Sequence, residues 1–406
     1  MDYLVKNPNE QWRSGTSKNI TFIVTKDCQL ACKYCYLVGK NSKERMSWDV
    51  AKRAVDYILC HESDFKEESV IWDFIGGEPF LEIDLIDRIC DYIKKEMYVR
   101  NHHWFDSYRF SFSTNGINYH DSKVQRFIEK NHLHLSIGIT IDGTKFKHDL
   151  NRVYKNSERG SYDDVVRNIP LWLSQFPGAG TKVTISSEDL PYIEESVIHL
   201  FSLGIHEVNI NCVFENVWKD GDDKIFENQL IQLADKIIDG GLYQDNTCSF
   251  FSETIGKPLD KALQNQNWCG AGMMLAVDAN GIFYPCTRFA QYSLRDKKAW
   301  TIGTVNDGID KNKIRGFLCL DRCTQSNQEC IDCEVASGCA WCQGENYDAA
   351  DTPTAYQRAT AICKMHKARV RANNYYWNKL YRKLELEGRR EEFEAKKKRV
   401  NDNLIC

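Results

Sequence analysis

Residues 26–36 of the 406-residue chain are Lys-Asp-Cys-Gln-Leu-Ala-Cys-Lys-Tyr-Cys-Tyr. This stretch places Cys28, Cys32 and Cys35 in a C-x3-C-x2-C array. The apolar run Ile20–Val24 comes just before it and a helical pattern follows, so we expect the array on the loop that leaves a buried strand. Three thiolates on one short loop can hold three corners of a cubane iron–sulfur cluster and leave the fourth iron open to another ligand. Structural zinc sites instead take four ligands, usually from C-x2-C pairs, and no fourth Cys or His lies nearby.

Composition and charge place the chain among ordinary globular proteins. Hydrophobic residues make up 42% of the chain and charged residues 27%, and its length suffices for two domains with a real core. The net charge of −4 gives no sign of a nucleic-acid partner. No run of 18 apolar residues predicts a membrane span, and the first residues do not resemble a signal peptide. We therefore expect a cytoplasmic protein.

The cysteines favour metal chemistry over disulfides. There are 17 of them, an odd count, and they gather in the first loop and between Cys269 and Cys363. Without a secretion signal, this distribution indicates cluster ligation rather than a disulfide framework. Because such clusters are sensitive to oxygen, we expect an anaerobe or a low-oxygen cytoplasm.

From Ile20 onward, apolar strands and amphipathic helices alternate six times. The predicted strands are Ile20–Thr25, Val70–Ile75, Tyr108–Thr114, His134–Ile141, Lys182–Ser186 and Glu207–Phe214. The predicted helices are Ser47–Cys60, Glu82–Tyr98, Asp121–Asn131, Ser161–Gln175, Tyr192–Leu203 and Asp223–Gly240. Six such units predict an α/β fold, a partial (β/α)6 barrel of the TIM type with parallel strands and outer helices. In barrels of this type the chemistry sits at the carboxyl ends of the strands, where the cysteine loop lies.

The composition divides the chain into five segments. They are an N-terminal arm (1–19), the barrel (20–240), a polar connector (241–268), a cysteine-rich module (269–363) and a charged C-terminal helix (364–406). The interleaved charges of the last segment are typical of a solvated packing helix, and a docking site for a substrate peptide is the alternative.

A second motif follows the cysteine array at a spacing that is typical of one enzyme family. Gly76-Gly77-Glu78-Pro79 ends the second predicted strand, about 40 residues after the array, and glycines there let the backbone approach a ligand closely. Both motifs resemble the radical S-adenosylmethionine (SAM) family. The resemblance implies that Cys28, Cys32 and Cys35 hold a [4Fe-4S] cluster that chelates SAM. It also implies that the Gly-Gly-Glu backbone receives the SAM amino group.

Further SAM contacts follow from the resemblance to its peptide-modifying branch. Tyr34 occupies the position of the adenine contact, and Thr140 and Arg152 suit the ribose and the carboxylate of SAM, Arg152 through its bidentate guanidinium. Other polar residues at strand ends can equally close loops. These are Asn115, Asp142 and Asp149, together with Ser186 and Ser187, for which loop capping is the better interpretation.

The C-terminal cysteines resemble a SPASM domain, the auxiliary-cluster module of these enzymes. Their pattern is C-x11-G-x4-C, then C-x2-C-x5-C-x2-C, then a lone cysteine, and the family pattern has x3 where this chain has the last x2. The resemblance implies two more [4Fe-4S] clusters, three in all. The distal cluster would use Cys330, Cys333, Cys339 and Cys363, and the proximal one Cys269, Cys286 and Cys342.

The proximal set lacks a fourth ligand. Cys319 and Cys323 are spare and either could close the site, or the site is open and receives a substrate thiolate, which iron would keep deprotonated. Cys60 and Cys90 fall within predicted helices, where we expect inert core thiols.

Together these features resemble radical SAM–SPASM peptide maturases of the sactipeptide and ranthipeptide kind. The resemblance implies cleavage of SAM to a 5′-deoxyadenosyl radical and a thioether crosslink in a ribosomally made, cysteine-containing precursor peptide. It implies a flavodoxin- or ferredoxin-type electron donor, and the short arm suggests a separate peptide-recognition protein. An anaerobic sulfatase maturase is one alternative, although Thr287 stands where those enzymes carry a catalytic Asp. A C–C crosslinking or epimerising maturase and a non-catalytic iron–sulfur protein are the others.

Overall fold

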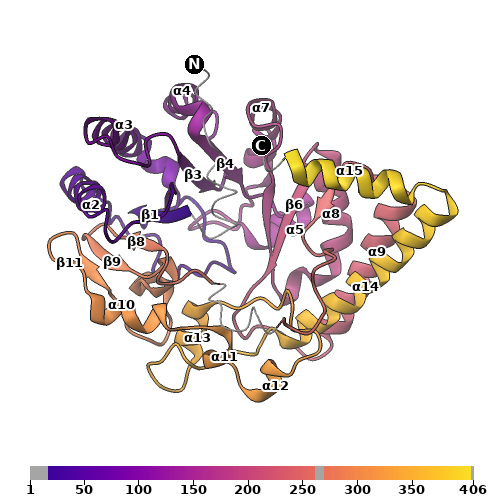
Figure 1. Cartoon of the computed structure of the whole chain (residues 1–406). Coiled ribbons are helices and arrows are strands. Elements are labelled where there is room, and N and C mark those ends of the chain that lie inside the picture. The colour runs from indigo at the N-terminus through magenta and orange to yellow at the C-terminus, as the bar shows by residue number, and fades with distance from the viewer. Residues whose placement is uncertain (1–16, 261–268, 404–406) are drawn as a thin grey trace.

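The computed structural model describes residues 17–260 and 269–403, and parallel strands surrounded by helices form its first half (Figure 1). The strands of this half are β1 (Ser17–Thr25), β2 (Ser69–Gly76), β3 (Tyr108–Thr114), β4 (Leu135–Ile139), β5 (Thr181–Ile185) and β6 (Glu207–Cys212). Strands β1 to β4 pair in parallel in chain order, and β5 pairs with β6 in a second sheet. A single parallel bridge, Thr140 to Lys182, joins the two sheets. The predicted partial barrel is thus confirmed.

The helices of the barrel alternate with its strands. They are α2 (Trp48–Cys60), α3 (Ile83–Val99), α4 (Ser122–Asn131), α5 (Lys145–Asn151), α6 (Tyr162–Val166), α7 (Ile169–Gln175), α8 (Ile193–Ser202) and α9 (Asp222–Asp239). Figure 1 shows α2, α3, α4, α7 and α9 outside the strands. Apolar side chains at helical spacing, such as Val55 and Ile58 of α2, pack on the sheet and are fully buried. Ser47 begins α2 by accepting the Val50 N–H at 3.2 Å.

One predicted helix is divided. The sequence pattern predicts Ser161–Gln175 as one helix, whereas α6 ends at Val166 and α7 begins at Ile169. Pro170 is the cause, because its ring has no N–H to donate and clashes with the carbonyl four residues earlier.

The segment predicted as a connector extends the barrel. It contains the 3-10 turn η4 (Leu242–Gln244) and β7 (Thr247–Cys248), which pairs in parallel with β6. Its stretch 264–267 lies outside the described residues, as do most of the predicted arm and Cys406. Strand β1 begins at Ser17, three residues before the predicted start, so the last residues of the predicted arm belong to the sheet.

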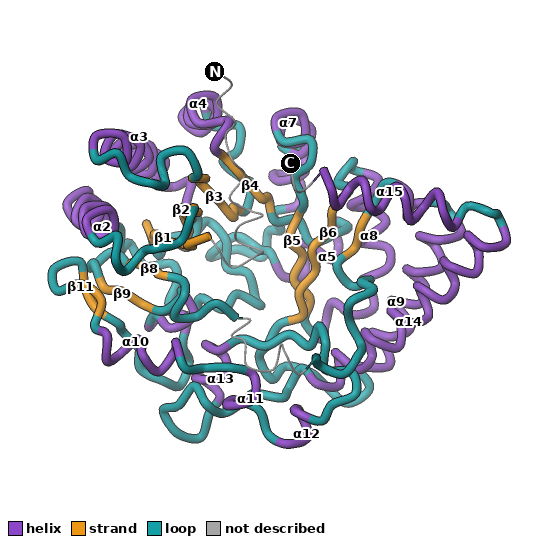
Figure 2. Tube along the Cα trace, viewed as in Figure 1, coloured by secondary structure: helices purple, strands orange, loops and turns teal. Residues whose placement is uncertain are grey.

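The cysteine-rich module joins the barrel through the other edge of the first sheet. Strand β8 (Leu275–Val277) pairs in parallel with β1, and β9 (Ile282–Tyr284), β10 (Gly303–Thr304) and β11 (Gly308–Ile309) continue the sheet antiparallel. The rest is mostly loop, as Figure 2 shows, with short helices. These are α10 (Lys311–Leu318), α11 (Arg322–Gln325), α12 (Gln328–Ile331) and α13 (Gln343–Ala349). Pairing of β8 with β1 brings the module beside the cysteine loop.

The charged tail forms two helices rather than one. They are α14 (Cys363–Leu386) and α15 (Arg390–Asn403), and the chain turns between them at Gly388, whose φ of +65° favours glycine. Helix α14 lies along α9, where Lys379 bonds both Asp235 at 2.7 Å and Asp239 at 2.9 Å. This contact agrees with the prediction of a packing helix. Among the described residues, no helix is both long enough and apolar enough to cross a membrane.

Candidate active site

Two glycines let the cysteine loop pass close to the end of β2. The Gly77 N–H donates to the Thr25 carbonyl at 2.9 Å, and the Glu78 N–H donates to the Asp27 carbonyl at 2.8 Å. A Cβ on Gly76 would lie 2.3 Å from the Thr25 carbonyl oxygen, and one on Gly77 would lie 2.1 Å from the Asp27 oxygen. Only glycine therefore allows this crossing of backbones, which fixes the start of the cysteine loop.

Glu78 fastens the loop to the end of β3. Its side chain is 1% exposed. One carboxylate oxygen accepts the Thr114 hydroxyl at 2.7 Å, and the other accepts the Asn115 N–H at 2.8 Å. Burial raises the pKa of Glu78, although these hydrogen bonds oppose the shift. The side chain thus serves as a buried acceptor that joins two strand ends.

The three thiols of the loop differ in their surroundings. Cys28 is buried, and burial followed by the nearby Glu78 raises the pKa of its thiol to about 12. Burial also raises the pKa of Cys32. Binding of a metal or cluster by these thiols would therefore release protons.

Among the described residues, no three cysteine sulfurs lie within 4.8 Å of one another. A lone tetrahedral ion needs sulfurs about 3.8 Å apart, whereas a cubane holds its thiolates farther apart.

A buried polar chain lies behind the loop. The Tyr34 hydroxyl donates to Asp142, and the Arg152 guanidinium donates to the Tyr34 oxygen at 2.9 Å. Burial alone would raise the pKa of Asp142, but Lys147 and Arg152 outweigh burial and lower it. Arg152 also acts electrostatically on Cys32, and its Nε is buried with no hydrogen-bond partner among the described residues. These hydrogen bonds thus hold Arg152 near the thiols with its Nε–H still available as a donor. A donor of positive charge in this position suits an anionic ligand group.

Other predicted strand-end residues have structural partners. Ser186 caps the turn after β5 and donates to the Asp189 carboxylate at 2.7 Å, as the capping interpretation predicts. The Asn115 amide donates to Gln29 at 3.0 Å, and Asp149 accepts the Tyr162 N–H at 2.9 Å. Thr140 lies at the junction of the two sheets, where its N–H donates to the Thr114 carbonyl at 3.0 Å. Its predicted contact with a ribose stays a prediction.

A cavity of about 390 Å³ opens at the carboxyl ends of the strands. The cysteine loop contributes Tyr34, Cys35 and Tyr36 to its wall, and the ends of β5 and β6 contribute others. The C-terminal module contributes Ser293 and Arg295 to the wall. The cavity therefore lies between the two cysteine-rich regions.

The proximal cysteines meet close to the first loop. Cys269 precedes β8, Cys286 follows β9 and Cys342 caps α13, so three separate segments supply them. Their thiols act on one another electrostatically, and burial, then Cys342, raises the pKa of Cys269 to about 11. The assignment of Cys342 to this set as a ligand stays a prediction.

Tyr36 and Arg288 connect the loop with the proximal set. The Tyr36 side chain shares a hydrogen bond with Thr287, beside Cys286, and the Arg288 guanidinium lies 4.8 Å from the centre of the Tyr36 ring. Arg288 also bonds Glu215 at 3.0 Å and Glu345 at 2.9 Å. Burial alone would lower the pKa of Arg288, but Cys342 and Glu215 outweigh it and raise the pKa. The positively charged Arg288 guanidinium thus lies between the cysteine loop and the proximal cysteines.

The four predicted distal cysteines line one cavity of about 400 Å³. They are Cys330, Cys333, Cys339 and Cys363. Arg358 donates to the Cys339 sulfur at 3.2 Å, and Arg322 lines the same cavity. The two guanidiniums stack against Trp341, at 5.1 and 5.8 Å from its ring centre. Four thiols with two adjacent cations suit a ligand whose net charge is negative, as a thiolate-bound cubane is.

The remaining cysteines are dispersed. Cys90 is fully buried in α3, as predicted, but Cys60 is exposed at the end of α2 and accepts a hydrogen bond from Arg100 at 3.1 Å. The prediction of a core thiol at Cys60 is wrong, because Cys60 is the last residue of α2 and is exposed, whereas its neighbours Ile58 and Leu59 are buried. Cys319 is exposed, next to Tyr356, and Cys323 is half-buried.

Sequence reasoning missed several residues that line or border the cavity. Three charged examples are Glu215, Arg288 and Arg295. No short motif contains them, because Glu215 follows β6 and its partner Arg288 lies 73 residues later. Arg288 stands two residues after Cys286, and that adjacency was the only signal available.

The comparisons with known proteins agree with this geometry. Residues 22–197 match the family model described as the Radical SAM superfamily. This part of the chain is a radical SAM domain. It contains the cysteine loop, the glycine pair and Arg152, and the family uses SAM and a [4Fe-4S] cluster.

Two curated relatives match part of this chain. An uncharacterised protein of Methanocaldococcus jannaschii is 30% identical over 196 residues, which are 48% of this chain and 63% of the relative. A cysteine-type anaerobic sulfatase-maturating enzyme of Clostridium novyi is 31% identical over 148 residues, 36% of this chain and 37% of the relative. The chain therefore spans less than two thirds of either relative.

Two solved structures share the fold over most of this chain. Native anSMEcpe with bound AdoMet and Kp18Cys peptide has a TM-score of 0.62 at 17% identity, covering 89% of this chain and 99% of that one. Streptococcus suis SuiB bound to precursor peptide SuiA has a TM-score of 0.57 at 15% identity, covering 88% and 82%. Both alignments extend past the radical SAM domain, so the likeness in fold includes the C-terminal half.

Proposed function

We propose that this protein is a radical SAM peptide maturase that joins a cysteine sulfur to a carbon of a ribosomally made precursor peptide. The observation that carries the proposal is the cavity between the cysteine loop and the C-terminal module. A peptide segment placed there would have the SAM site on one side and the proximal cysteines on the other. That arrangement suits a reaction in which carbon is activated at one site and sulfur is held at the other.

Three groups of cysteines would hold three [4Fe-4S] clusters. Cys28, Cys32 and Cys35 would hold the SAM-binding cluster, and the proximal and distal sets the auxiliary ones. When bound, SAM and the clusters supply a 5′-deoxyadenosyl radical and a route for electrons. The separation of the sulfurs in each set and the two arginines of the distal cavity support this assignment.

The side chains of the protein position these groups. Glu78 fixes the cysteine loop against β3, and the Tyr34–Asp142–Arg152 chain supports it from behind. Arg152 would donate to the SAM carboxylate through its free Nε. Arg288 would offset the negative charge of the thiolates at the proximal set. A bound peptide would close the cavity and so exclude water from the substrate carbon that reacts.

The proximal set has three cysteines, which come from three separate segments. We infer that the site is open and that the substrate thiolate completes it. The net reaction removes one hydrogen from carbon and one from sulfur and forms the C–S bond. The 5′-deoxyadenosyl radical would take the hydrogen from carbon as an atom, and the thiol would lose a proton. Bond formation between the carbon radical and the thiolate would release one electron, for which the auxiliary clusters would be the acceptor.

A sulfatase-maturase reaction is the second candidate, because one curated relative and one solved structure are of that kind. Thr287 weighs against it, since a hydroxyl has far too high a pKa to act as the general base that a carboxylate provides. The two reactions differ in the fate of sulfur. A thioether keeps it, whereas conversion of cysteine to formylglycine loses it.

The test is anaerobic reaction of the cluster-loaded protein with SAM, a reductant and cysteine-containing peptides encoded beside its gene. We expect 5′-deoxyadenosine and a peptide that has lost two hydrogens, kept its sulfur and lost a free thiol. A product without sulfur would support the sulfatase-maturase reaction instead. No 5′-deoxyadenosine from protein with a full cluster complement would overturn both.

A further inference from the structure

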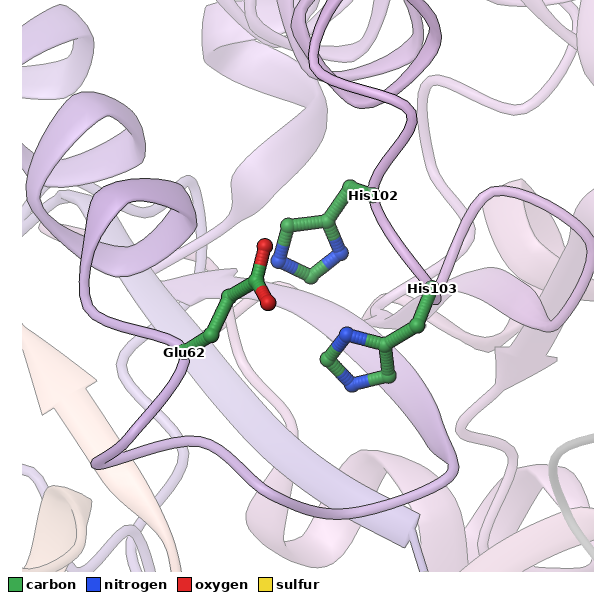
Figure 3. A group of neighbouring side chains, drawn as sticks. All are labelled: Glu62, His102 and His103. Atoms are coloured by element: carbon green, nitrogen blue, oxygen red, sulfur yellow. The ribbon is translucent and has the colours of Figure 1, made fainter.

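A second group of metal-ligating side chains lies at the opposite end of the barrel strands. Glu62 follows α2 and precedes β2, and His102 and His103 lie between α3 and β3. One ligand atom from each of the three residues lies within 4.8 Å of the others. Figure 3 shows the Glu62 carboxylate and the two imidazoles turned toward one another. The cysteine loop, by contrast, leaves the carboxyl end of β1.

The tautomer of His103 leaves its Nδ1 available to bind a metal ion. Its Nε2 lies 3.0 Å from the Glu67 carbonyl oxygen, which accepts a hydrogen only from a protonated nitrogen. The proton is thus held on Nε2, and the Nδ1 lone pair faces Glu62 and His102 (Figure 3). Metal-bound histidines usually have this second hydrogen bond, which fixes the tautomer and the orientation of the ring.

His102 supplies an independent sign of a ligand. It is 2% exposed, and its Nε2 is buried with no hydrogen-bond partner among the described residues. Figure 3 shows this nitrogen directed at the Glu62 carboxylate. A buried polar atom without a partner costs free energy, so a group that would satisfy it is expected at this position.

We propose that Glu62, His102 and His103 bind a divalent transition-metal ion of the zinc class, with water in the fourth position. Two imidazoles and one carboxylate are a ligand set that this class prefers. Tetrahedral geometry places the ligand atoms about 3.3 Å apart, so small side-chain rotations close the set around the ion.

Binding through His102 has one consequence for the tautomer. In the structure, the His102 Nδ1 accepts a hydrogen bond from the backbone N–H of Trp104, and this bond is long, at 3.2 Å. Ligation through Nε2 moves the ring proton to Nδ1 and gives up that bond. The affinity is therefore moderate, and loading displaces the turn that carries Trp104.

The site is structural rather than catalytic. It joins the loops before β2 and β3 at the amino-terminal face of the barrel, where side chains serve stability, whereas chemistry uses the other face. The proposal is therefore independent of the proposed function.

The experiment is an anaerobic titration of the cluster-loaded protein with Co²⁺, followed by absorption spectroscopy. Cluster loading occupies the ligating cysteines, and sulfur–cobalt charge-transfer bands reveal binding to any other thiol. The variants are Glu62→Gln and His103→Asn, both at exposed positions, and His61→Asn is the matched control because it removes the neighbouring histidine of the same loop. The thermal midpoint with and without Co²⁺ is measured in parallel.

We expect one additional Co²⁺ per chain with d–d bands of a nitrogen–oxygen site and a raised thermal midpoint. His61→Asn should behave like the wild type, and Glu62→Gln and His103→Asn should bind at least about tenfold more weakly. Equal binding by all four proteins, or bands of sulfur ligation alone, would overturn the proposal.

Discussion

The two cysteine-rich regions of this protein are built in different ways. The first loop carries Cys28, Cys32 and Cys35 within eight residues, and hydrogen bonds from Gly77 and Glu78 fix its start. The distal set draws Cys330 and Cys363 from segments 33 residues apart, in a module that is mostly loop (Figure 2). The barrel therefore forms the first site from its own contacts, whereas the module would depend on the proposed clusters to hold its segments together.

This difference predicts how each region responds to loss of metal. A metal site assembled from separate loops contributes much of the folding free energy of its domain. A loop that is fastened to a buried sheet has packing to maintain it. The four predictions that follow test this comparison, from the largest expected effect to the smallest.

Cys32→Ala should abolish formation of 5′-deoxyadenosine while the fold stays intact. Removal of one of three ligands destroys the SAM-binding cluster, so iron content should fall by about a third in a protein with three clusters. Product analysis by mass spectrometry and iron assays measure both. Cys60→Ser is the matched control, since this exposed thiol lies at the end of α2. Equal loss of activity in the control would contradict the assignment.

Removal of iron by a chelator should unfold the module before the barrel. Residues 319–363 lack long helices and strands, so limited proteolysis should cleave there first, while the fragment that contains β1 to β6 persists. Mass spectrometry of the fragments reports the order. Simultaneous cleavage of both regions would show that the barrel also depends on its cluster.

Gly77→Ala should disrupt the first site through the backbone alone. The new Cβ would lie 2.1 Å from the Asp27 carbonyl oxygen, so the loop must move, and we expect a loss of stability of about 3 kcal/mol. Gly316→Ala in α10 meets no atom within 4 Å and is the control, with an expected change of less than about 1 kcal/mol. Denaturant unfolding measures both. Similar stabilities for the two variants would show that the crossing tolerates a side chain.

Glu78→Gln should weaken the same region by a smaller amount. The amide nitrogen cannot accept, so either the Thr114 hydroxyl or the Asn115 N–H loses its acceptor. We expect a loss of about 2 kcal/mol, measured by denaturant unfolding, and a lower iron content after reconstitution. Wild-type stability in the Glu78→Gln variant would mean that Glu78 does not join the strand ends.

The difference between the regions also explains what could be predicted from sequence. The six strands and the cysteine loop follow from local patterns, and β3 has the predicted bounds. Short-range spacing also indicates Glu78 and the distal cysteines. The pairing of β8 with β1 and the division of α6 from α7 depend on tertiary contacts and on one proline, so periodicity did not reveal them.

Charged partners that are far apart in sequence gave no signal. Tyr34 and Asp142 are 108 residues apart, and Glu62 approaches His102 only because two loops meet at one end of the barrel. The sequence singles out Tyr34 and Asp142 separately, but only the three-dimensional arrangement shows that they are partners.

The electron paramagnetic resonance spectrum of the reduced protein, recorded before and after addition of SAM, tests the central claim most directly. An iron that Cys28, Cys32 and Cys35 leave open should bind SAM, so the signal of that cluster should shift on addition. The shift should be absent in Cys32→Ala, which retains the auxiliary clusters. An unchanged spectrum in wild-type protein with its full iron content would contradict the account.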